Sequence, residues 1–361
     1  MGDRSPPRYI TDTIIRGGLA VALYAIFPAF SDIHRLWERQ AGLVPGWPFG
    51  VFEYPPIGAL YFAPFGLLPS STWAVIVNGA IMLAAAVAIT AILMRLTADP
   101  PHEDIDVGMW VSSPALLLLL PINWDALVGL MLLWGVVAVS RSRPTASGMW
   151  LGAGTAFKVF PGSVVLPVLP LIRKWSHRTA FLVSGAVVLG GSYLIYALVD
   201  PEGWRFHLEF AALRDDTQST IWGLLERGFE VFGASLSMDT INTASTLTVI
   251  VAIVALTVWV ARAKPSFPEA AAVAIMVLLA FNKVFKPQYV LWVIPFLAWI
   301  RASRVKVRIL ETTAIVQFTV IYFALPEVIY VAETGVRLVI LFLLCTEIVR
   351  SRFGEHALSE T

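Results

Sequence analysis

Long apolar segments separated by short polar connections fill most of this sequence. The apolar segments lie at residues 14–30, 72–94, 107–122, 125–140, 146–158, 160–172, 179–199, 243–261, 269–282, 288–300, 309–325 and 335–349. An α-helix needs about 20 mostly apolar residues to cross the hydrocarbon core of a bilayer. The pattern therefore predicts an all-α polytopic membrane protein with about twelve transmembrane segments.

Several of these segments are too short to cross a bilayer alone. Residues 146–158 and 160–172 are adjacent apolar halves, a pattern typical of broken or partly inserted helices that flank a cavity. Residues 57–69 are apolar but shorter than a span, so we expect a juxtamembrane helix there, within a first extracytoplasmic loop at 31–71. The other long connection, 200–242, is expected to form a second large extracytoplasmic loop.

The composition agrees with a membrane protein. The 361 residues are 57% hydrophobic and 14% charged, with a mean hydropathy of +0.74, whereas soluble domains carry about 25% charged residues. A net charge of +1 gives no support for nucleic acid as a partner. The single cysteine, Cys345, excludes an intrachain disulfide. With neither an internal repeat nor a long linker, we expect residues 1–361 to form a single transmembrane domain.

The distribution of Lys and Arg predicts which side of the membrane each connection faces. The favoured orientation places both termini in the cytoplasm, together with the connections at 95–106, 141–145, 173–178, 262–268 and 301–308. These parts hold 17 of the 26 Lys and Arg residues, and cytoplasmic loops carry an excess of basic residues. This orientation requires that 57–69 does not cross. We therefore expect a multi-pass protein of the cell membrane, surrounded by membrane lipids, with its polar motifs converging on the extracytoplasmic face.

Asp32 stands directly after the first apolar segment, and His34 follows two residues later. A carboxylate at the membrane surface keeps access to water and avoids the cost of burial at the bilayer centre. Its position leaves two interpretations open. In the first, Ser31 and Asp32 only cap a helix. In the second, Asp32 is a general base that takes a proton from an acceptor hydroxyl. The aromatic, Pro- and Gly-rich segment that follows and ends at Tyr54 predicts a folded loop lying on the membrane.

Two further polar motifs lie between apolar segments. Asn123 and Asp125 flank Trp124, and they form either a helix-capping turn with an interfacial Trp or a site where a carboxylate orients a substrate hydroxyl. Lys158 follows a segment, 148–154, whose glycines allow close helix packing in lipid. A lysine between two short apolar halves either extends to the interface or marks a functional site.

Basic residues gather near the ends of later segments. Lys283 and Lys286 are three residues apart and would share one helical face, with Gln288 and Tyr289 beside them. Two ammonium groups at the outer membrane edge suit a phosphate or diphosphate, and binding of bulk anionic lipid is the alternative. Arg337, two residues into the last apolar segment, is expected at a similar depth.

The remaining signals are weaker or absent. The loop 200–242 mixes charged and aromatic residues, including His207, and is either a solvated amphipathic segment or part of an acceptor path. The chain has no Walker loop, no Rossmann glycine motif, no HExxH and no paired CxxC. Its five histidines are scattered and do not form a ligand set. We expect neither a metal nor another cofactor.

Taken together, these motifs resemble the polytopic glycosyltransferases of the GT-C class, and among them glycosyltransferase family 87. The likeness runs from about residue 30 to residue 300 and is carried, in this order, by Asp32, Tyr54-Pro55-Pro56, Asn123-Trp124-Asp125, Phe157-Lys158-Val159-Phe160-Pro161 and Asn282-Lys283-Val284-Phe285-Lys286-Pro287-Gln288-Tyr289. That family resembles mannosyltransferases of actinobacterial cell envelopes, which use polyprenyl-phosphate mannose.

The resemblance implies a function and a set of site residues. We expect a membrane glycosyltransferase, in particular a mannosyltransferase, that moves a sugar from a polyprenyl-phosphate donor to a lipid or glycan acceptor on the extracytoplasmic face, with inversion and without a metal. Asp32 would be the catalytic base. The donor phosphate would be held by Lys158, Lys283, Lys286 and Arg337. Contacts to the substrates are expected from His34, Tyr54, Asn123, Asp125, His207, Gln288 and Tyr289.

Two other functions compete with this interpretation. A lipid-linked sugar transporter or flippase would also use broken helices and outward-facing cations. Against it, the polar groups gather on one side and no repeat is detectable, while alternating access needs a route to both sides. A non-catalytic membrane subunit is the third alternative, but it would have little use for several cations around one interfacial carboxylate.

Overall fold

The structure is a computed structural model that describes residues 6–41, 52–98, 105–213 and 219–359. Within these ranges the regular elements are all helices, and no strand is present. The α-helices are α1 (Pro6–Ile26), α2 (Asp32–Ala41), α3 (Pro56–Phe62), α4 (Ser71–Thr97), α5 (Val107–Val111), α6 (Pro114–Leu118), α7 (Asp125–Ser140), α8 (Pro144–Phe157), α9 (Val165–Val168), α10 (Trp175–Val199), α11 (Pro201–Leu213), α12 (Ile221–Val231), α13 (Met238–Ala263), α14 (Phe267–Phe281), α15 (Val290–Trp299), α16 (Arg304–Phe323) and α17 (Glu327–Ser359). The predicted all-α class is confirmed for this part of the chain.

Five of the described helices are long and apolar enough to cross a membrane. They are α1, α4, α10, α13 and the part of α17 up to Ser351. This finding agrees with a membrane-embedded protein, whereas the count of about twelve spans stays a prediction. Shorter apolar helices of 10–17 residues lie between the long ones.

Prolines divide the apolar segments that the sequence marked as too short. Two residues separate the end of α5 from Pro114, which starts α6; proline lacks the N–H that a continuing helix needs. The segment 160–171 is likewise a series of short turns, η3 (Phe160–Val164), α9 and η4 (Leu169–Leu171). The prediction of a broken helix at this point is confirmed: α8 ends at Phe157, and Lys158 follows it with extended backbone.

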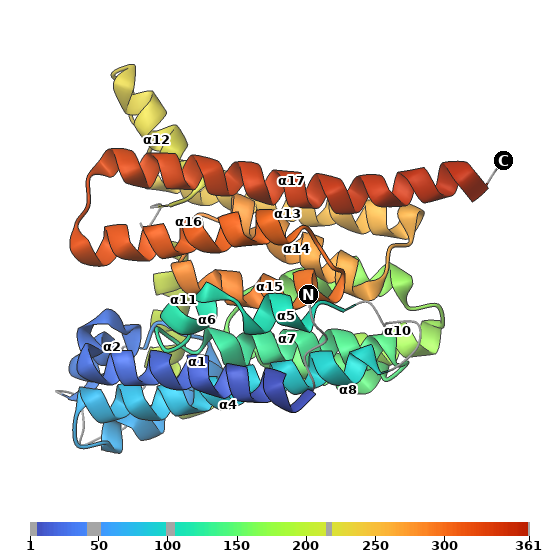
Figure 1. Ribbon diagram of the computed structural model, residues 1–361. Coiled ribbons are helices and arrows are strands. Elements are labelled where there is room, and N and C mark those ends of the chain that lie inside the picture. Colours follow the sequence, from blue (N-terminus) through green and yellow to red (C-terminus); the bar gives the residue numbers. More distant parts are fainter. Residues whose placement is uncertain (1–5, 42–51, 99–104, 214–218, 360–361) are drawn as a thin grey trace.

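The helices lie roughly along one direction in a layered bundle (Figure 1). α16 and α17 pack together on one side, and α1 and α4 pack together on the other. Between them α7 contacts both α4 and α15, while α8 is paired with α10. The site described below therefore forms where helices from the middle layers begin and end.

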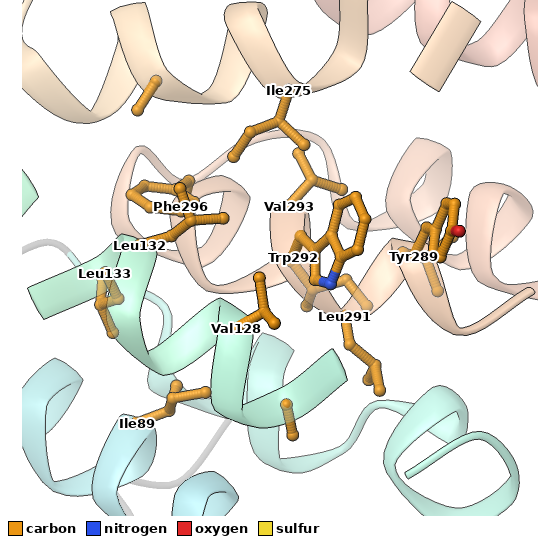
Figure 2. Packing of buried hydrophobic residues seen from close by; sticks show 14 of the residues in the cluster. Ile89, Val128, Leu132, Leu133, Ile275, Tyr289, Leu291, Trp292, Val293 and Phe296 are labelled. Carbon is orange, nitrogen blue, oxygen red and sulfur yellow. The ribbon is translucent and has the colours of Figure 1, made fainter. Parts of the chain in front are cut away.

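The core is centred on α15, a ten-residue helix with every residue buried. Figure 2 shows Trp292 and Phe296 of α15 among Val128 and Leu132 of α7, with Ile275 of α14 on the other side. A helix that is apolar around its whole circumference is stable only when protein or lipid surrounds it. Here the surrounding is protein, which fixes the start of α15 against α7.

The segments predicted to lie at the membrane surface form short helices. α2 has strongly amphipathic character: Ile33 and Leu36 are buried, whereas Arg35 is exposed. α3 is followed by η2 (Ala63–Leu67) and packs on α8, where a Cβ added at Gly58 would stand 2.8 Å from the carbonyl oxygen of Phe157. A helix is thus present at the predicted juxtamembrane position, and its failure to cross the membrane stays a prediction.

Glycines bring α8 and α10 into direct backbone contact. A Cβ at Gly148 would stand 2.1 Å from the carbonyl oxygen of Phe181, and one at Gly152 would stand 2.5 Å from the carbonyl oxygen of Gly185. Small residues allow this close approach between membrane helices. The expected packing role is confirmed for these two glycines.

We expect Gly152→Ala to destabilise the protein by about 1–3 kcal/mol, because the added methyl group overpacks the α8–α10 contact. The matched control is Gly191→Ala in α10, whose Cβ would meet nothing within 4 Å and whose helix propensity would improve by roughly 0.5–1 kcal/mol. Thermal unfolding in detergent measures both. An equal effect of the two substitutions would contradict the packing role of Gly152.

Candidate functional site

The site begins where the chain turns from α1 into α2. The backbone N–H of Asp32 donates to the carbonyl oxygen of Ile122 at 2.9 Å, and the Ser31 hydroxyl donates to that of Pro121 at 3.0 Å. Ser31 is fully buried, whereas Asp32 is only partly buried. The first residue of α2 is therefore fixed against the segment that leads into Asn123.

Two side-chain amides bind the Asp32 carboxylate. Asn123 Nδ2 and Gln288 Nε2 both donate to Asp32 Oδ2, each at 3.3 Å. The same Asn123 amide group donates to the Tyr54 hydroxyl at 3.1 Å. These four residues, here called the Asp32 network, come from four separate parts of the chain. The arrangement orients a carboxylate that keeps partial access to solvent, as a general base requires.

A second set of bonds fixes the Asn123 amide. Its Oδ1 accepts from the Trp124 backbone N–H at 2.8 Å, so its nitrogen points toward Asp32. Asn78 Nδ2 donates to the Asn123 carbonyl oxygen at 3.2 Å, and the Tyr61 hydroxyl donates to Asn78 at 2.9 Å. Asn78 was not among the predicted site residues, although a polar residue within an apolar segment such as 72–94 often marks a functional site.

Lys158 and Asp125 form a buried ion pair beside this network. Lys158 Nζ lies 2.7 Å from Asp125 Oδ1, and the side chains are only 5% and 1% exposed. Four aromatic rings surround the ammonium group at 5.0–5.9 Å from their centroids, those of Tyr54, Trp124, Tyr289 and Trp292. Such rings attract a desolvated cation through their electron-rich faces. The Tyr289 and Trp292 rings stack with their centroids 4.3 Å apart; both residues are labelled in Figure 2.

A cavity of about 580 Å³ adjoins Tyr54 and Lys158. Its polar end is lined by Glu53, Tyr54, Lys158, His207, Asn282 and Lys283. Its other end is apolar and is lined by residues such as Leu166, Ile250 and Val254, which are 46%, 53% and 51% exposed. The cavity therefore extends from a polar, cationic chamber to the apolar outer surface of the bundle. This shape suits an amphipathic ligand with a charged head and a hydrocarbon tail.

Lys283 lies at the polar end of the cavity, just after α14. Its ammonium group donates to Asn242 Oδ1, in the first two turns of α13. Ser245, one turn further along α13, also lines the cavity and is buried. Neither Asn242 nor Ser245 was identified from the sequence. A polar turn at the start of an otherwise apolar helix gives only a general signal of a helix end.

His207 connects α11 to the polar end of the cavity. Its Nδ1 lies 3.1 Å from the Glu53 carbonyl oxygen and its Nε2 lies 3.2 Å from the Tyr193 hydroxyl. A carbonyl only accepts, so Nδ1 carries the hydrogen and Nε2 accepts from Tyr193. Burial lowers the pKa of His207, and the bond to the Glu53 carbonyl opposes this effect. The neutral imidazole thus holds the segment that carries Tyr54.

Three predicted site residues lie outside the cavity, the Asp32 network and the ion pair of Lys158 with Asp125. Arg337 is buried, pairs with Glu333 at 2.7 Å and places its guanidinium 3.8 Å from the centroid of the Phe285 ring. His34 pairs with Glu38 along α2 at 3.1 Å. Lys286 does not line the cavity. Their predicted roles stay predictions. Among the described residues, no group of three His, Cys, Asp or Glu side chains is arranged to hold a metal ion.

Comparison with known proteins gives one family and a set of named relatives. The model of glycosyltransferase family 87 matches residues 52–287, which is more than half of the chain. This range includes Tyr54, Asn123, Lys158 and Lys283 but ends before Gln288 and begins after Asp32.

Two curated relatives carry the same name, polyprenol-phosphate-mannose-dependent alpha-(1-2)-phosphatidylinositol mannoside mannosyltransferase. The relative from Mycolicibacterium smegmatis is 27% identical over 304 residues, covering 75% of this chain and 64% of its own length. The relative from Mycobacterium tuberculosis is 30% identical over 171 residues, covering 43% of this chain and 39% of its own length. The chain thus spans less than two thirds of the length of these relatives.

The lowered pKa of His207 predicts a dependence of stability on pH. In the unfolded chain this histidine binds a proton near pH 6.5, whereas in the folded state its pKa is lower. The free energy of unfolding should therefore decrease as the pH falls from about 6.5 to the folded-state pKa. We expect the unfolding temperature to fall less between pH 7.5 and 5.5 in His207→Gln than in the wild type. The control is His177→Gln, on a different connection. An identical pH dependence in wild type and His207→Gln would contradict this role.

Proposed function

We propose that this chain, which belongs to glycosyltransferase family 87, transfers mannose from polyprenyl-phosphate mannose to a lipid-linked acceptor. Two features of the site together support the proposal. Asp32 is an oriented carboxylate, and next to its network lies an amphipathic cavity whose polar end is lined by Lys158 and Lys283. The names of the two relatives support the choice of donor and of a lipid acceptor.

The shape of the cavity supports a polyprenyl-phosphate sugar as the donor. The isoprenoid chain would lie along the apolar end, which reaches the outer surface of the bundle at Ile250 and Val254. Lys283, held by Asn242, would bind the phosphate through a charge-assisted contact. The sugar would then face Tyr54 and His207 at the enclosed polar end.

The proposed reaction is an inverting displacement at the anomeric carbon, without a metal. The acceptor oxygen attacks that carbon while the bond to the phosphate oxygen breaks, and the phosphate leaves with the bonding electron pair. Asp32 takes the acceptor's proton; because both amides donate to Oδ2, Oδ1 is the atom that receives it. Lys283 and Lys158 stabilise the negative charge that develops on the phosphate.

The proposed topology places this reaction on the extracytoplasmic face, with both termini in the cytoplasm. Its support is the excess of Lys and Arg on the opposite side. The predicted loops 31–71 and 200–242 would share the outer face, and His207 donates across them to the Glu53 carbonyl. A transporter is not favoured, because the family and the names of both relatives are those of glycosyltransferases.

We expect Asp32→Asn to lower turnover by about 10² to 10⁴ while donor binding persists, because the amide keeps the shape but cannot accept the proton. The matched control, Glu38→Gln, removes an exposed carboxylate from the same helix and should leave turnover near wild type. Transfer of labelled mannose measures both variants. Near-normal turnover of Asp32→Asn would show that another residue is the base. A loss of donor binding would show that Asp32 has a structural role.

We expect Lys283→Gln to weaken donor binding roughly tenfold or more, since a hydrogen bond to a charged group contributes about 1.5–3 kcal/mol. Lys174→Gln removes an exposed lysine that does not line the cavity and serves as the control. Binding of polyprenyl-phosphate mannose to purified protein is the measurement. Unchanged affinity would exclude Lys283 as the phosphate ligand.

A further inference from the structure

A buried polar cluster joins α16 to α17, which lie side by side (Figure 1). Arg337 of α17 donates through Nη1 to Glu333 Oε2 at 2.7 Å and to Gln317 Oε1 of α16 at 3.3 Å. All three side chains are buried, and none of them lines the cavity. Glu333 balances the charge of Arg337, so the neutral Gln317 has its amide nitrogen left to donate to another partner.

That partner is the backbone segment that carries two site residues. Gln317 Nε2 donates to the carbonyl oxygen of Phe285 at 3.1 Å. Phe285 lies in a non-helical stretch between the end of α14 and the start of η5 (Pro287–Tyr289), so its carbonyl depends on a partner from outside a helix. Lys283, two residues earlier, lines the polar end of the cavity, and Gln288, three residues later, donates to Asp32.

The same cluster holds the Phe285 side chain. The guanidinium carbon of Arg337 lies 3.8 Å from the centroid of the Phe285 ring, where a cation is attracted to the ring face. The Phe285 ring in turn contacts the Tyr289 ring edge to face, with centroids 6.1 Å apart. Lys158 Nζ lies 5.0 Å from the centroid of the Tyr289 ring. A continuous series of contacts thus connects Arg337 to Lys158.

The cluster also reaches the beginning of the segment. Arg337 Nη2 donates to the Ser219 carbonyl oxygen, and the Ser219 hydroxyl donates to Glu333 Oε1 at 3.2 Å. Shortly after Ser219, at the start of α12, Trp222 Nε1 donates to the carbonyl oxygen of Phe281 at 2.7 Å. Phe281 is the last residue of α14. The connection between α14 and η5 is therefore held both at its start and at Phe285.

We propose that Gln317 is a positioning residue of the transferase site, which together with Arg337 fixes residues 282–289 so that Lys283 lies in the cavity and Gln288 reaches Asp32. This inference rests on the proposed function, because it assigns the effect of Gln317 to Lys283 as a ligand of the donor phosphate. Gln317 itself touches no substrate. A misplacement of about 1 Å far from the chemistry can lower a rate by roughly 10².

The test is a double-mutant cycle on binding of polyprenyl-phosphate mannose, below the unfolding temperature of every variant. Gln317→Met has a similar size but cannot donate, and it should bind the donor roughly threefold to tenfold more weakly. Gln317→Met/Lys283→Gln should bind no more weakly than Lys283→Gln alone, because the residue that Gln317 positions is already lost. A role in stability alone would leave the donor affinity of the folded protein unchanged.

The matched control is Thr319→Val in the same helix, which removes a hydroxyl that donates at 2.9 Å to the Ile315 carbonyl within α16. It should bind the donor like the wild type. A second readout needs no activity: backbone hydrogen exchange of residues 282–289 should be faster in Gln317→Met than in the wild type, with no change in residues 159–166 across the cavity. If Gln317→Met does not fold, Gln317→Glu takes its place, since it keeps an acceptor for Arg337 but loses the amide donor.

Three results would overturn the proposal. Unchanged exchange in residues 282–289 would show that Gln317 does not hold the segment. Unchanged donor affinity in Gln317→Met would show that the contact does not serve the site, and additive losses in the double variant would show that its effect does not pass through Lys283. Failure of the wild type to bind the donor is a different result: it would overturn the proposed function, whatever the exchange measurement shows for Gln317.

Discussion

A buried ammonium group must have partners. At this site the group belongs to Lys158, and its partner is Asp125, where the end of α8 meets the start of α7. Removing two charges from water is expensive, and leaving one of them unpaired in a protein interior costs about 3–5 kcal/mol. The pair fixes the last turn of α8 to the first residue of α7 at 2.7 Å. Of the four rings around Lys158, that of Trp124 stands beside Asp125, and those of Tyr54, Tyr289 and Trp292 come from two further segments, so the same cation also contacts these segments.

The polar side chains of the site are concentrated where helices end. The reason is that an apolar environment offers the backbone groups at a helix end no water to bond. Inside a helix every backbone group is already bonded, whereas a break exposes carbonyl and N–H groups that need partners. Here the carbonyl oxygens of Pro121, Ile122 and Asn123 accept, in that order, from the Ser31 hydroxyl, the Asp32 backbone N–H and the Asn78 amide. The same contacts that satisfy the broken backbone thereby hold the catalytic candidates in place.

The helices and the order of the motifs were readable from the sequence, because both depend on local patterns. α7 matches the apolar segment 125–140, and the break after Lys158 follows from the prolines around it. The partners were not readable. Gln288 reaches Asp32 across 256 positions, and nothing local reveals that contact. Arg337 shows the same limit: its depth was inferred from its place in an apolar segment, but the direction of its side chain is set by Glu333, Gln317 and Phe285.

Asp32 does not line the cavity, whereas Tyr54, which accepts a hydrogen bond from Asn123 of the Asp32 network, does. Under the proposed inverting mechanism this separation has a chemical reason. The attacking oxygen and the leaving phosphate lie on opposite sides of the anomeric carbon, so the base and the phosphate-binding cations have to be separated by the sugar itself. A lysine in contact with Asp32 would also neutralise the charge that makes the carboxylate basic. The structure instead gives Asp32 neutral amide donors and gives the ammonium group of Lys158 its own carboxylate, Asp125.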